Sequence, residues 1–200
     1  MTDPALASQK AALRIDARNR RKGLLIEHPE ADWMAADHAE AMLVALKLTR
    51  PGVMAIYKAL GAEIDPRPMG DIMIKTGWRL ALPSVEDPDG PMVFRTWAPG
   101  ERLAHDLTGL PAPLVAAPEV RPDIIITPLL AFDRAGRRLG QGGGHYDRTF
   151  DALREAGKRP PFIGMAFSGQ EYDAVPHEPH DQRLDGFLTE AGYIAARKDD

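Results

Sequence analysis

The sequence has 200 residues, of which 44% are hydrophobic and 27% are charged, a composition typical of a globular protein of about one domain. It has no cysteine, which excludes disulfides, cysteine-ligated metals and thiol catalysis, and its net charge of −4 argues against general nucleic-acid binding. No apolar run approaches the ~20 residues that cross a bilayer, and the N-terminus has no secretory signal pattern. We therefore expect one domain over residues 1–200, cytoplasmic, with no nucleic-acid or membrane partner.

The first predicted element is a basic helix over residues 3–22. Asp3-Pro4 is a helix start, because the carboxylate can cap and proline has no N–H to leave unpaired, and Gly23 is a plausible stop. Lys10, Arg14 and Arg18 recur every fourth residue, so they share one face. The residues alone leave this stripe as either a solvated face or an anion clamp.

Short apolar runs then alternate with helical segments. Residues 123–127 are β-branched and bounded by proline on both sides, which predicts a central strand buried on both faces. Residues 92–97 follow the run 80–82 after a turn and are expected to pair with it antiparallel. The other predicted strands cover residues 53–57, 162–167 and 187–189, and the other predicted helices cover residues 35–48, 66–77 and 146–156. The alternation predicts an α/β fold with a mainly parallel sheet.

The segment that carries chemistry is PLLAFDRAGRRLGQGGGHYDR, residues 128–148. Its glycines lower the stability of regular structure, which suggests that the backbone must approach something closely. Consecutive N–H groups followed by a helix start form an anion site, Arg137 and Arg138 lie beside it, and Asp147 can cap the helix or hold Mg²⁺. A Walker A loop would need a lysine here, and a dinucleotide loop would need glycine where His145 stands. The residues alone leave two interpretations, a phosphate-binding loop and a turn made for packing.

This segment resembles the signature of the 5-formyltetrahydrofolate cyclo-ligases, the 5,10-methenyltetrahydrofolate synthetases. The resemblance covers nearly the whole chain, although the glycine loop is its most specific part. Outside the loop, the matching residues are Lys10, Arg14, Glu63, Leu82-Pro83, Gln170, Val175-Pro176, His180-Asp181 and Thr189-Glu190. The chain departs from the family pattern at Gln141, usually aromatic or basic, at His145, usually tyrosine, and at Ala112, often glutamate.

The resemblance implies a three-layer, Rossmann-like α/β fold with a mainly parallel central sheet and a CoA-transferase-like topology. It also implies an ATP- and Mg²⁺-dependent ligase that converts 5-formyltetrahydrofolate into 5,10-methenyltetrahydrofolate by phosphorylating the formyl oxygen, releasing ADP and phosphate. The partners would be these small molecules, and the enzyme would be a monomer. The nucleotide is expected at the carboxyl ends of the central strands.

Site residues follow from the same match. The implied catalytic residues are Lys10, Arg138 and Tyr146. The implied ATP-binding residues are Lys10, Arg14, Arg138, Gly140, Gln141, Gly142, Gly143, Gly144, His145, Tyr146 and Asp147. The resemblance further implies charge from Arg148, a magnesium ligand in Asp147, and folate contacts from Glu63, Met92, His145 and Tyr146.

Two alternatives remain open from the sequence. The chain could be a family member that binds folate or nucleotide without turnover, as the departures at Gln141, His145 and Ala112 suggest. It could also be a sugar-phosphate isomerase or a CoA-transferase-like enzyme of related topology. A metal site at His177 and His180 is disfavoured, because Pro179 argues against the helix that would place both rings on one face.

Overall fold

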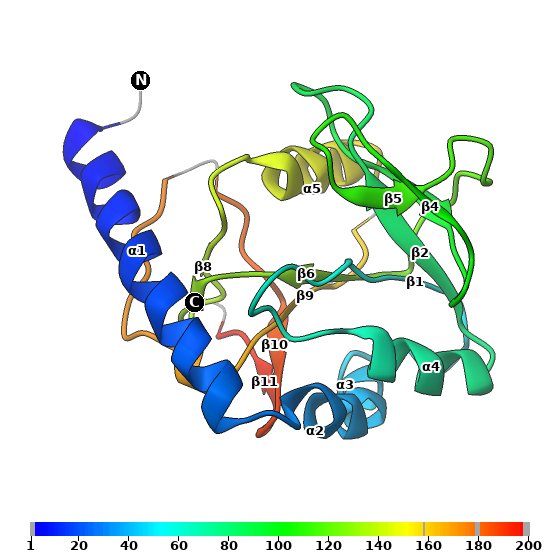
Figure 1. The fold of residues 1–200 in the computed structure, drawn as a ribbon, viewed down its shortest axis with the longest axis horizontal. Helices are drawn as coiled ribbons and strands as arrows, with labels where there is room; N and C mark the ends of the chain where they lie inside the picture. Colours follow the sequence, from blue (N-terminus) through cyan, green and yellow to red (C-terminus); the bar gives the residue numbers. More distant parts are fainter. Residues whose placement is uncertain (1–2, 158, 179–180, 198–200) are drawn as a thin grey trace.

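A computed structural model describes residues 3–157, 159–178 and 181–197 (Figure 1). His180, which belongs to the matched C-terminal pattern and to the disfavoured histidine pair, lies outside these residues. The helices are α1 (Pro4–Glu27), α2 (Ala31–Asp37), α3 (Ala39–Ala45), α4 (Arg67–Lys75) and α5 (His145–Glu155), with a short 3-10 turn η1 (Ser168–Gln170).

The N-terminal helix begins where the sequence predicts but runs further. The Asp3 carboxylate accepts a hydrogen bond from the Ala5 N–H at 2.9 Å, and Pro4 occupies the first turn. The predicted stop at Gly23 is wrong, because α1 continues to Glu27. The added turn carries Leu24 onto Gly169 of η1, and this packing holds the last turn in place.

The single helix predicted over residues 35–48 is instead two short helices, α2 and α3, with a bend at His38. Ala35 and Ala39, on either side of the bend, are both fully buried. Because of the bend, the alanines of both α2 and α3 pack against the core.

Seven strands form the main sheet, in the order β11-β10-β9-β6-β1-β2-β3. Neighbours from β10 to β2 are parallel, and the edge strands β11 and β3 run antiparallel. Its strands are β1 (Val53–Ala55), β2 (Arg79–Ser84), β3 (Val93–Thr96), β6 (Ile124–Pro128), β9 (Phe162–Met165), β10 (Gly186–Thr189) and β11 (Gly192–Ala195). The prediction of an α/β fold with a mainly parallel sheet is confirmed.

The most specific strand predictions are also confirmed. β6 lies in the middle of the sheet, and its Ile124, Ile125, Ile126 and Thr127 are all at most 1% exposed. β3 pairs antiparallel with β2, with Ala81 opposite Thr96. The antiparallel edge strand β11 was not predicted, since the sequence Gly-Tyr-Ile-Ala is too short to show a pattern.

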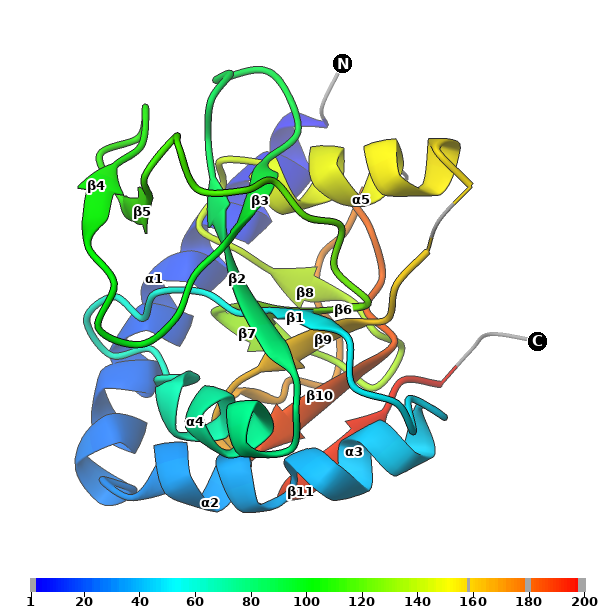
Figure 2. The ribbon, with the colours of Figure 1, turned by 90° about the vertical axis from the view of Figure 1, so that its right-hand side faces the viewer.

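Helices cover both faces of the sheet and give three layers. In both Figure 1 and Figure 2, α5 lies over one face and α2, α3 and α4 lie over the other. Ile124 and Ile126 of β6 pack in the core under α2–α4, whereas Ile125 packs with Phe150 of α5. Alternate strand residues therefore supply two separate hydrophobic cores.

Two small hairpins outside the main sheet position the site. The hairpin of β7 (Ala131–Phe132) and β8 (Arg138–Leu139) delivers the glycine loop to the start of α5, and α1 packs on it through Ala17. The hairpin of β4 (Leu103–His105) and β5 (Pro111–Pro113) pairs outside the main sheet. Neither hairpin was predicted, because their strands have only two or three residues and β5 contains two prolines.

Candidate active site

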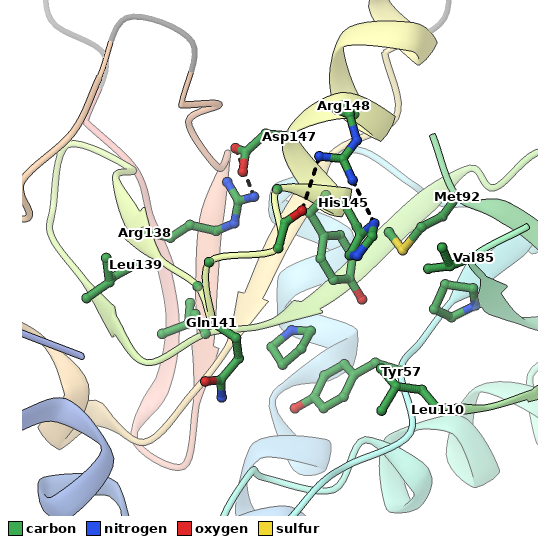
Figure 3. Close-up of a pocket in the computed structure, with 18 of the residues that line it drawn as sticks. Tyr57, Val85, Met92, Leu110, Arg138, Leu139, Gln141, His145, Asp147 and Arg148 are labelled. Carbon is green, nitrogen blue, oxygen red and sulfur yellow. Dashed lines mark hydrogen bonds and ion pairs between the residues drawn. The ribbon is translucent and has the colours of Figure 1, made fainter. Parts of the chain in front are cut away.

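One cavity of about 680 Å³ opens at the carboxyl ends of the central strands. Pro128 ends β6, Val85 directly follows β2, and Tyr57 follows β1 by two residues, and all three line the cavity. Figure 3 shows Arg138 and Asp147 at one end of this cavity, and Met92, Val85, Leu110 and Tyr57 at the other. We call these the phosphate end and the apolar end.

The glycine loop, residues 140–144, lines the phosphate end between β8 and α5. Gly142 and Gly144 have φ values of +108° and +68°, which favour glycine over every other residue. A Cβ on Gly142 would lie 3.5 Å from the Arg14 guanidinium, an ordinary van der Waals contact, so the positive φ rather than crowding favours glycine there. Within the described chain, the N–H groups of residues 140–144 donate to no protein acceptor. The loop therefore offers unused donors, as the anion-site interpretation requires.

α1 is bonded directly to this loop. Arg14 Nε donates to the Gly140 carbonyl at 3.0 Å, and Arg18 donates twice to Gln141 Oε1, at 2.8 and 3.2 Å. The predicted stripe is therefore not a solvated face. Of the three residues of the stripe, Lys10 and Arg14 line the cavity, whereas Arg18 is not among its lining residues and contacts the loop through Gln141.

Lys10 occupies a buried position at the mouth of the cavity, only 7% exposed. Its Nζ forms ion pairs with Glu178 at 2.7 Å and Asp181 at 2.6 Å, contacts that join residues about 170 positions apart in the chain. Burial alone would lower the pKa of Lys10, but the hydrogen bonds to the two carboxylates outweigh it and raise the pKa. Lys10 is therefore a fixed cation.

Arg138 and Asp147 form an ion pair across the phosphate end. Arg138 Nη2 donates to Asp147 Oδ1 at 3.0 Å and Nη1 donates to the Gln182 carbonyl at 2.8 Å, with the guanidinium 5.2 Å from the centre of the Phe150 ring. Asp147 Oδ1 also accepts the Gln182 N–H. The option that Asp147 caps α5 is wrong, because the cap position is Gly144 and no side chain bonds there. The helix begins after Gly144, whose backbone is in the left-handed region, so the Asp147 carboxylate is not used as a cap and faces the cavity.

His145 and Arg148 link the glycine loop to the turn before β3. Arg148 donates to the carbonyls of Gly143, Pro88 and Gly90, and its Nη2 lies 2.8 Å from His145 Nδ1. Because arginine only donates, His145 Nδ1 is the acceptor and its proton lies on Nε2. Burial and the adjacent Arg148 cation lower the pKa of His145, opposed by Asp106.

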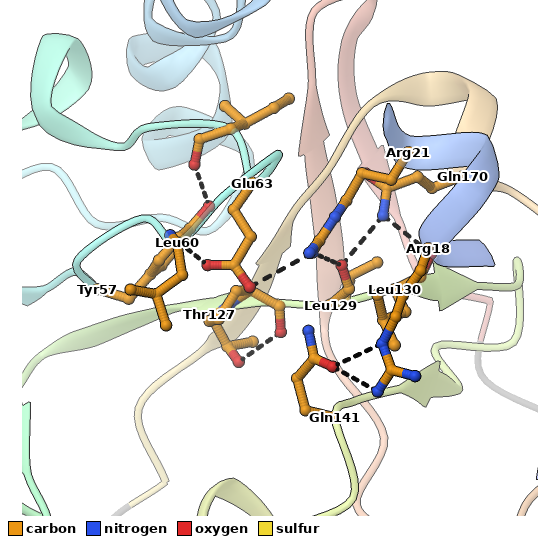
Figure 4. Close-up of polar contacts among 12 residues, drawn as sticks. Arg18, Arg21, Tyr57, Leu60, Glu63, Thr127, Leu129, Leu130, Gln141 and Gln170 are labelled. Carbon is orange, nitrogen blue, oxygen red and sulfur yellow. Dashed lines mark hydrogen bonds and ion pairs between the residues drawn. The ribbon is translucent and has the colours of Figure 1, made fainter. Parts of the chain in front are cut away.

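A buried carboxylate marks the apolar end of the cavity. Glu63 Oε1 accepts from Arg21 at 3.3 Å and Oε2 accepts from the Leu60 N–H at 3.0 Å (Figure 4). Burial raises the pKa of Glu63, while the Leu60 N–H and Arg21 act in the opposite direction. The nearby Tyr57 hydroxyl donates to the Ile64 carbonyl, so that ring is fixed as well.

Apolar walls enclose this end. The Met92 N–H donates to Thr149 Oγ1 at 2.9 Å, which holds Met92 against α5. Tyr146, also at the cavity, has its pKa raised by burial and by the negative charge of Glu63. The remaining apolar lining residues are Leu60, Pro83, Val85, Leu110, Pro111 and Leu129. These residues give this end of the cavity the apolar lining that a heterocyclic ring would need.

Every site residue implied by the family resemblance lines this one cavity, so the structure brings all of them together. Arg137, which the sequence also placed beside the glycine loop, is not among the described lining residues and instead forms an ion pair with Asp133 at 3.7 Å. Sequence reasoning missed Tyr57, Lys58, Val85, Asp106 and Glu178, which also line it. The first three lie within three residues of the ends of β1 and β2, so strand ends were a usable signal, whereas nothing local marks Asp106 or Glu178. Ala112 is buried in β5 and is not among the lining residues of the described chain, so its departure from the family pattern lies outside the cavity.

In the described ranges, no helix has the length and apolar character needed to cross a membrane. Nor, among the residues placed there, do three histidine, aspartate or glutamate side chains gather closely enough to hold a metal ion by themselves.

Comparison with known proteins gives consistent relatives. A model of the 5-formyltetrahydrofolate cyclo-ligase family matches residues 6–190. The 5-formyltetrahydrofolate cyclo-ligase of Mycolicibacterium smegmatis is 32% identical over 199 residues, covering 94% of this chain and 97% of that protein. The enzyme of the same name from Escherichia coli K12 is 29% identical over 177 residues, covering 86% and 95%.

A solved structure shares the fold. The NMR structure of Aquifex aeolicus 5,10-methenyltetrahydrofolate synthetase has a TM-score of 0.73 at 26% identity and covers 96% of this chain and 94% of its own. The three-layer, Rossmann-like arrangement predicted from the sequence is thereby confirmed.

Proposed function

Because this chain belongs to the 5-formyltetrahydrofolate cyclo-ligase family, we propose that its cavity binds 5-formyltetrahydrofolate beside ATP and closes the ring between N5 and N10. The products are 5,10-methenyltetrahydrofolate, ADP and phosphate. The observation that carries the proposal is a single cavity that joins a glycine loop and fixed cations to an apolar end with a buried carboxylate. Because all proposed site residues lie in one chain, we propose a monomer of one domain.

The chemistry needs activation of a poor leaving group. The γ-phosphoryl group leaves ADP and bonds to the formyl oxygen. The N10 lone pair then bonds to the formyl carbon, the carbon–oxygen bond breaks, phosphate departs and N10 loses its proton. Phosphoryl transfer relies on positioning and charge neutralisation rather than on a protein nucleophile, which suits a chain without cysteine.

We assign the triphosphate to the phosphate end. In the described chain the N–H groups of residues 140–144 donate to no protein acceptor, they directly precede the start of α5, and Lys10, Arg14 and Arg138 line the same cavity. Arg138 and Lys10 are catalytic in this proposal because they would neutralise charge on the transferring phosphoryl group. Arg148 adds a further cation at the rim of the loop.

Magnesium fits the donors present at this end. The carboxylates of Asp147, Asp151, Glu178 and Asp181 line it, and Mg²⁺ commonly takes one or two carboxylates together with water and phosphate oxygens. Asp147 is the ligand proposed here, and the ion when bound would neutralise charge on the phosphates. Asp147 also holds Arg138, so the same carboxylate would connect the ion to the proposed catalytic cation.

We assign the pterin to the apolar end. A carboxylate accepts two N–H bonds at once, which suits Glu63 to the adjacent ring N–H and amino donors of a reduced pterin. Met92 would pack against the ring. His145, which lies between the two ends in Figure 3, and Tyr146, the next residue and also a lining residue, would contact the formyl group where it meets the γ-phosphate. Tyr146, the third proposed catalytic residue, remains protonated because its pKa is raised, so it would donate to the reacting oxygen.

The test is product formation. We expect the purified protein with 5-formyltetrahydrofolate, ATP and Mg²⁺ to produce the absorbance of the methenyl product, and to produce none when ATP is omitted. Binding of folate without product at high enzyme concentration would contradict the proposal and favour a binding protein. Preference for a sugar phosphate or an acyl-CoA over both substrates would favour the other alternative.

A matched pair of variants tests the phosphate end. Lys10→Met should raise the KM for ATP at least roughly tenfold, since hydrogen bonds to charged groups are worth about 1.5–3 kcal/mol. Lys22→Met, an exposed lysine on the same helix, should leave it unchanged. Equal effects of both variants would remove Lys10 from the site.

A further inference from the structure

Arg21 lies on α1 three residues beyond Arg18, the last residue of the basic stripe, and its side chain is buried. It is 7% exposed, and its Nη1 donates to Glu63 Oε1 at 3.3 Å and to the Leu129 carbonyl at 3.2 Å (Figure 4). The Leu129 carbonyl also accepts Gln170 Nε2 at 3.0 Å. Arg21 is thus tied to the end of β6 and to a carboxylate that faces the cavity, although it is not itself among the described lining residues.

The Glu63 carboxylate is held on both oxygens. Arg21 bonds Oε1 and the Leu60 N–H bonds Oε2, while the side chain still lines the cavity. A carboxylate offers about four lone-pair sites, so two protein donors leave acceptor capacity for a ligand. The two bonds set the plane of the Glu63 carboxylate and therefore the direction of the lone pairs that remain for a ligand.

Stability of the fold does not account for this pair. Replacing a buried ion pair by apolar side chains of similar volume is often neutral, because desolvation offsets the attraction. Arg21 Nε is buried and, within the described chain, has no hydrogen-bond partner, which costs stability rather than adding it. Burial disfavours the charged form of Glu63, and Arg21 is one of two groups that oppose this effect.

We propose that Arg21 is a positioning residue that orients the Glu63 carboxylate toward the N–H donors of the substrate's heterocycle. The inference rests on the proposed function, which places the pterin at Glu63. It also makes α1 a single support for both ends of the cavity, since Arg14 of the same helix contacts the glycine loop. Both Arg21 contacts, to Glu63 and to the Leu129 carbonyl, lie at the apolar end, so its loss should affect folate and leave ATP binding unchanged.

The experiment is a double-mutant cycle on the full-length protein. Arg21→Met and Glu63→Gln are made singly and together, and the KM values for 5-formyltetrahydrofolate and ATP are measured for each. Arg21→Met should raise the folate KM at least tenfold and change the ATP KM less than twofold. In the Glu63→Gln background the same substitution should change the folate KM less than twofold, because a neutral amide needs no counter-charge.

Two further variants separate positioning from folding. Arg21→Lys keeps the charge and should return the folate KM to within about fivefold of wild type. Arg20→Met removes a neighbouring arginine that packs over the Tyr172 ring and should change neither KM. If Arg21→Met does not fold, Arg21→Gln, which removes the charge but keeps an N–H donor, takes its place in the cycle, and a rise in the folate KM without a rise in the ATP KM is again expected.

The outcomes are distinct. Equal rises of folate and ATP KM in Arg21→Met, or the same rise with Glu63→Gln present, would overturn the role of Arg21. Absence of methenyl product from the wild-type protein would instead overturn the proposed function. In that case the role of Arg21 is decided by the dissociation constants of 5-formyltetrahydrofolate, measured by calorimetry on the same variants. If the wild-type protein does not bind 5-formyltetrahydrofolate, both the proposed function and the role of Arg21 are overturned.

Discussion

At the scale of single residues, each cation of the phosphate end is already held by protein oxygen atoms. Lys10 is bonded to two carboxylates, Arg138 to Asp147 and a carbonyl, and Arg14 to the Gly140 carbonyl. A guanidinium has five N–H donors, so these bonds orient Arg14 and Arg138 without exhausting them. Binding a triphosphate then needs little further ordering of flexible lysine and arginine side chains, which removes one part of the entropic cost of binding.

His145 should make this site sensitive to acid. Its neutral Nδ1 accepts from Arg148, and its pKa lies below the ordinary value of about 6.5 because burial and Arg148 disfavour a second cation. Between the lowered pKa and 6.5 the unfolded chain binds more protons than the folded one, so the free energy of unfolding falls as the pH falls through that window. The stabilising contribution is fully present above 6.5.

Two measurements check this prediction. The His145 ring proton, assigned by its loss in His145→Gln, should titrate by NMR with a midpoint below 6.5. Urea denaturation should show that the wild-type protein loses more stability than His145→Gln when the pH is lowered from 7.5 to 5. A midpoint at or above the ordinary histidine value would contradict the prediction.

At the scale of elements, the β4–β5 hairpin is held at the cavity by one side chain. Asp106 Oδ2 accepts the Val85 N–H at 3.1 Å, and Oδ1 accepts the N–H groups of Thr108 and Leu110 at 2.9 and 3.0 Å. The Leu107 N–H adds a bond to the Val85 carbonyl. Since Val85 and Leu110 both line the apolar end, Asp106 fixes two walls of the proposed folate site at once.

Asp106→Ala should therefore weaken folate binding without affecting ATP. Burial would raise the pKa of Asp106, but the hydrogen bonds that its side chain makes outweigh this effect and lower the pKa. The ionised carboxylate is therefore the form that accepts these bonds. Losing bonds worth about 1 kcal/mol each should raise the folate KM by roughly tenfold, while the ATP KM stays within twofold. Steady-state kinetics with each substrate varied in turn would show it, and a matching rise for ATP would instead indicate general loss of structure.

At the scale of the whole molecule, sequence reasoning succeeds where a local pattern determines the outcome. Proline-bounded β-branched residues predicted β6, and clustered glycines predicted a loop over residues 140–144 ahead of α5, because both requirements lie within a few neighbouring residues. It fails where distant packing decides, as when Leu24 against Gly169 carries α1 past Gly23. The partners of Lys10, more than 160 residues away, and the role of Asp106 depend on the completed topology in the same way.

The aromatic core under α5 joins these scales, because it supports the helix that carries Tyr146, Asp147 and Arg148. Phe150 stacks on Phe162 of β9 with ring centres 3.6 Å apart, and is completely buried. Its face also receives the Arg138 guanidinium, so one ring supports both the sheet contact of α5 and a proposed catalytic cation.

Phe150→Ala should lower the free energy of unfolding by about 3–5 kcal/mol, the usual cost of removing a buried phenylalanine. Urea denaturation should show a lower midpoint with an unchanged slope, as expected when the surface exposed on unfolding is the same. Glu155→Ala, at an exposed position on the same helix, should stay within about 0.5 kcal/mol of wild type. A loss below about 1 kcal/mol in Phe150→Ala would mean that the cavity left by the ring collapses. The packing of α5 would then not depend on this stack, and Arg138 would need another explanation for its fixed position.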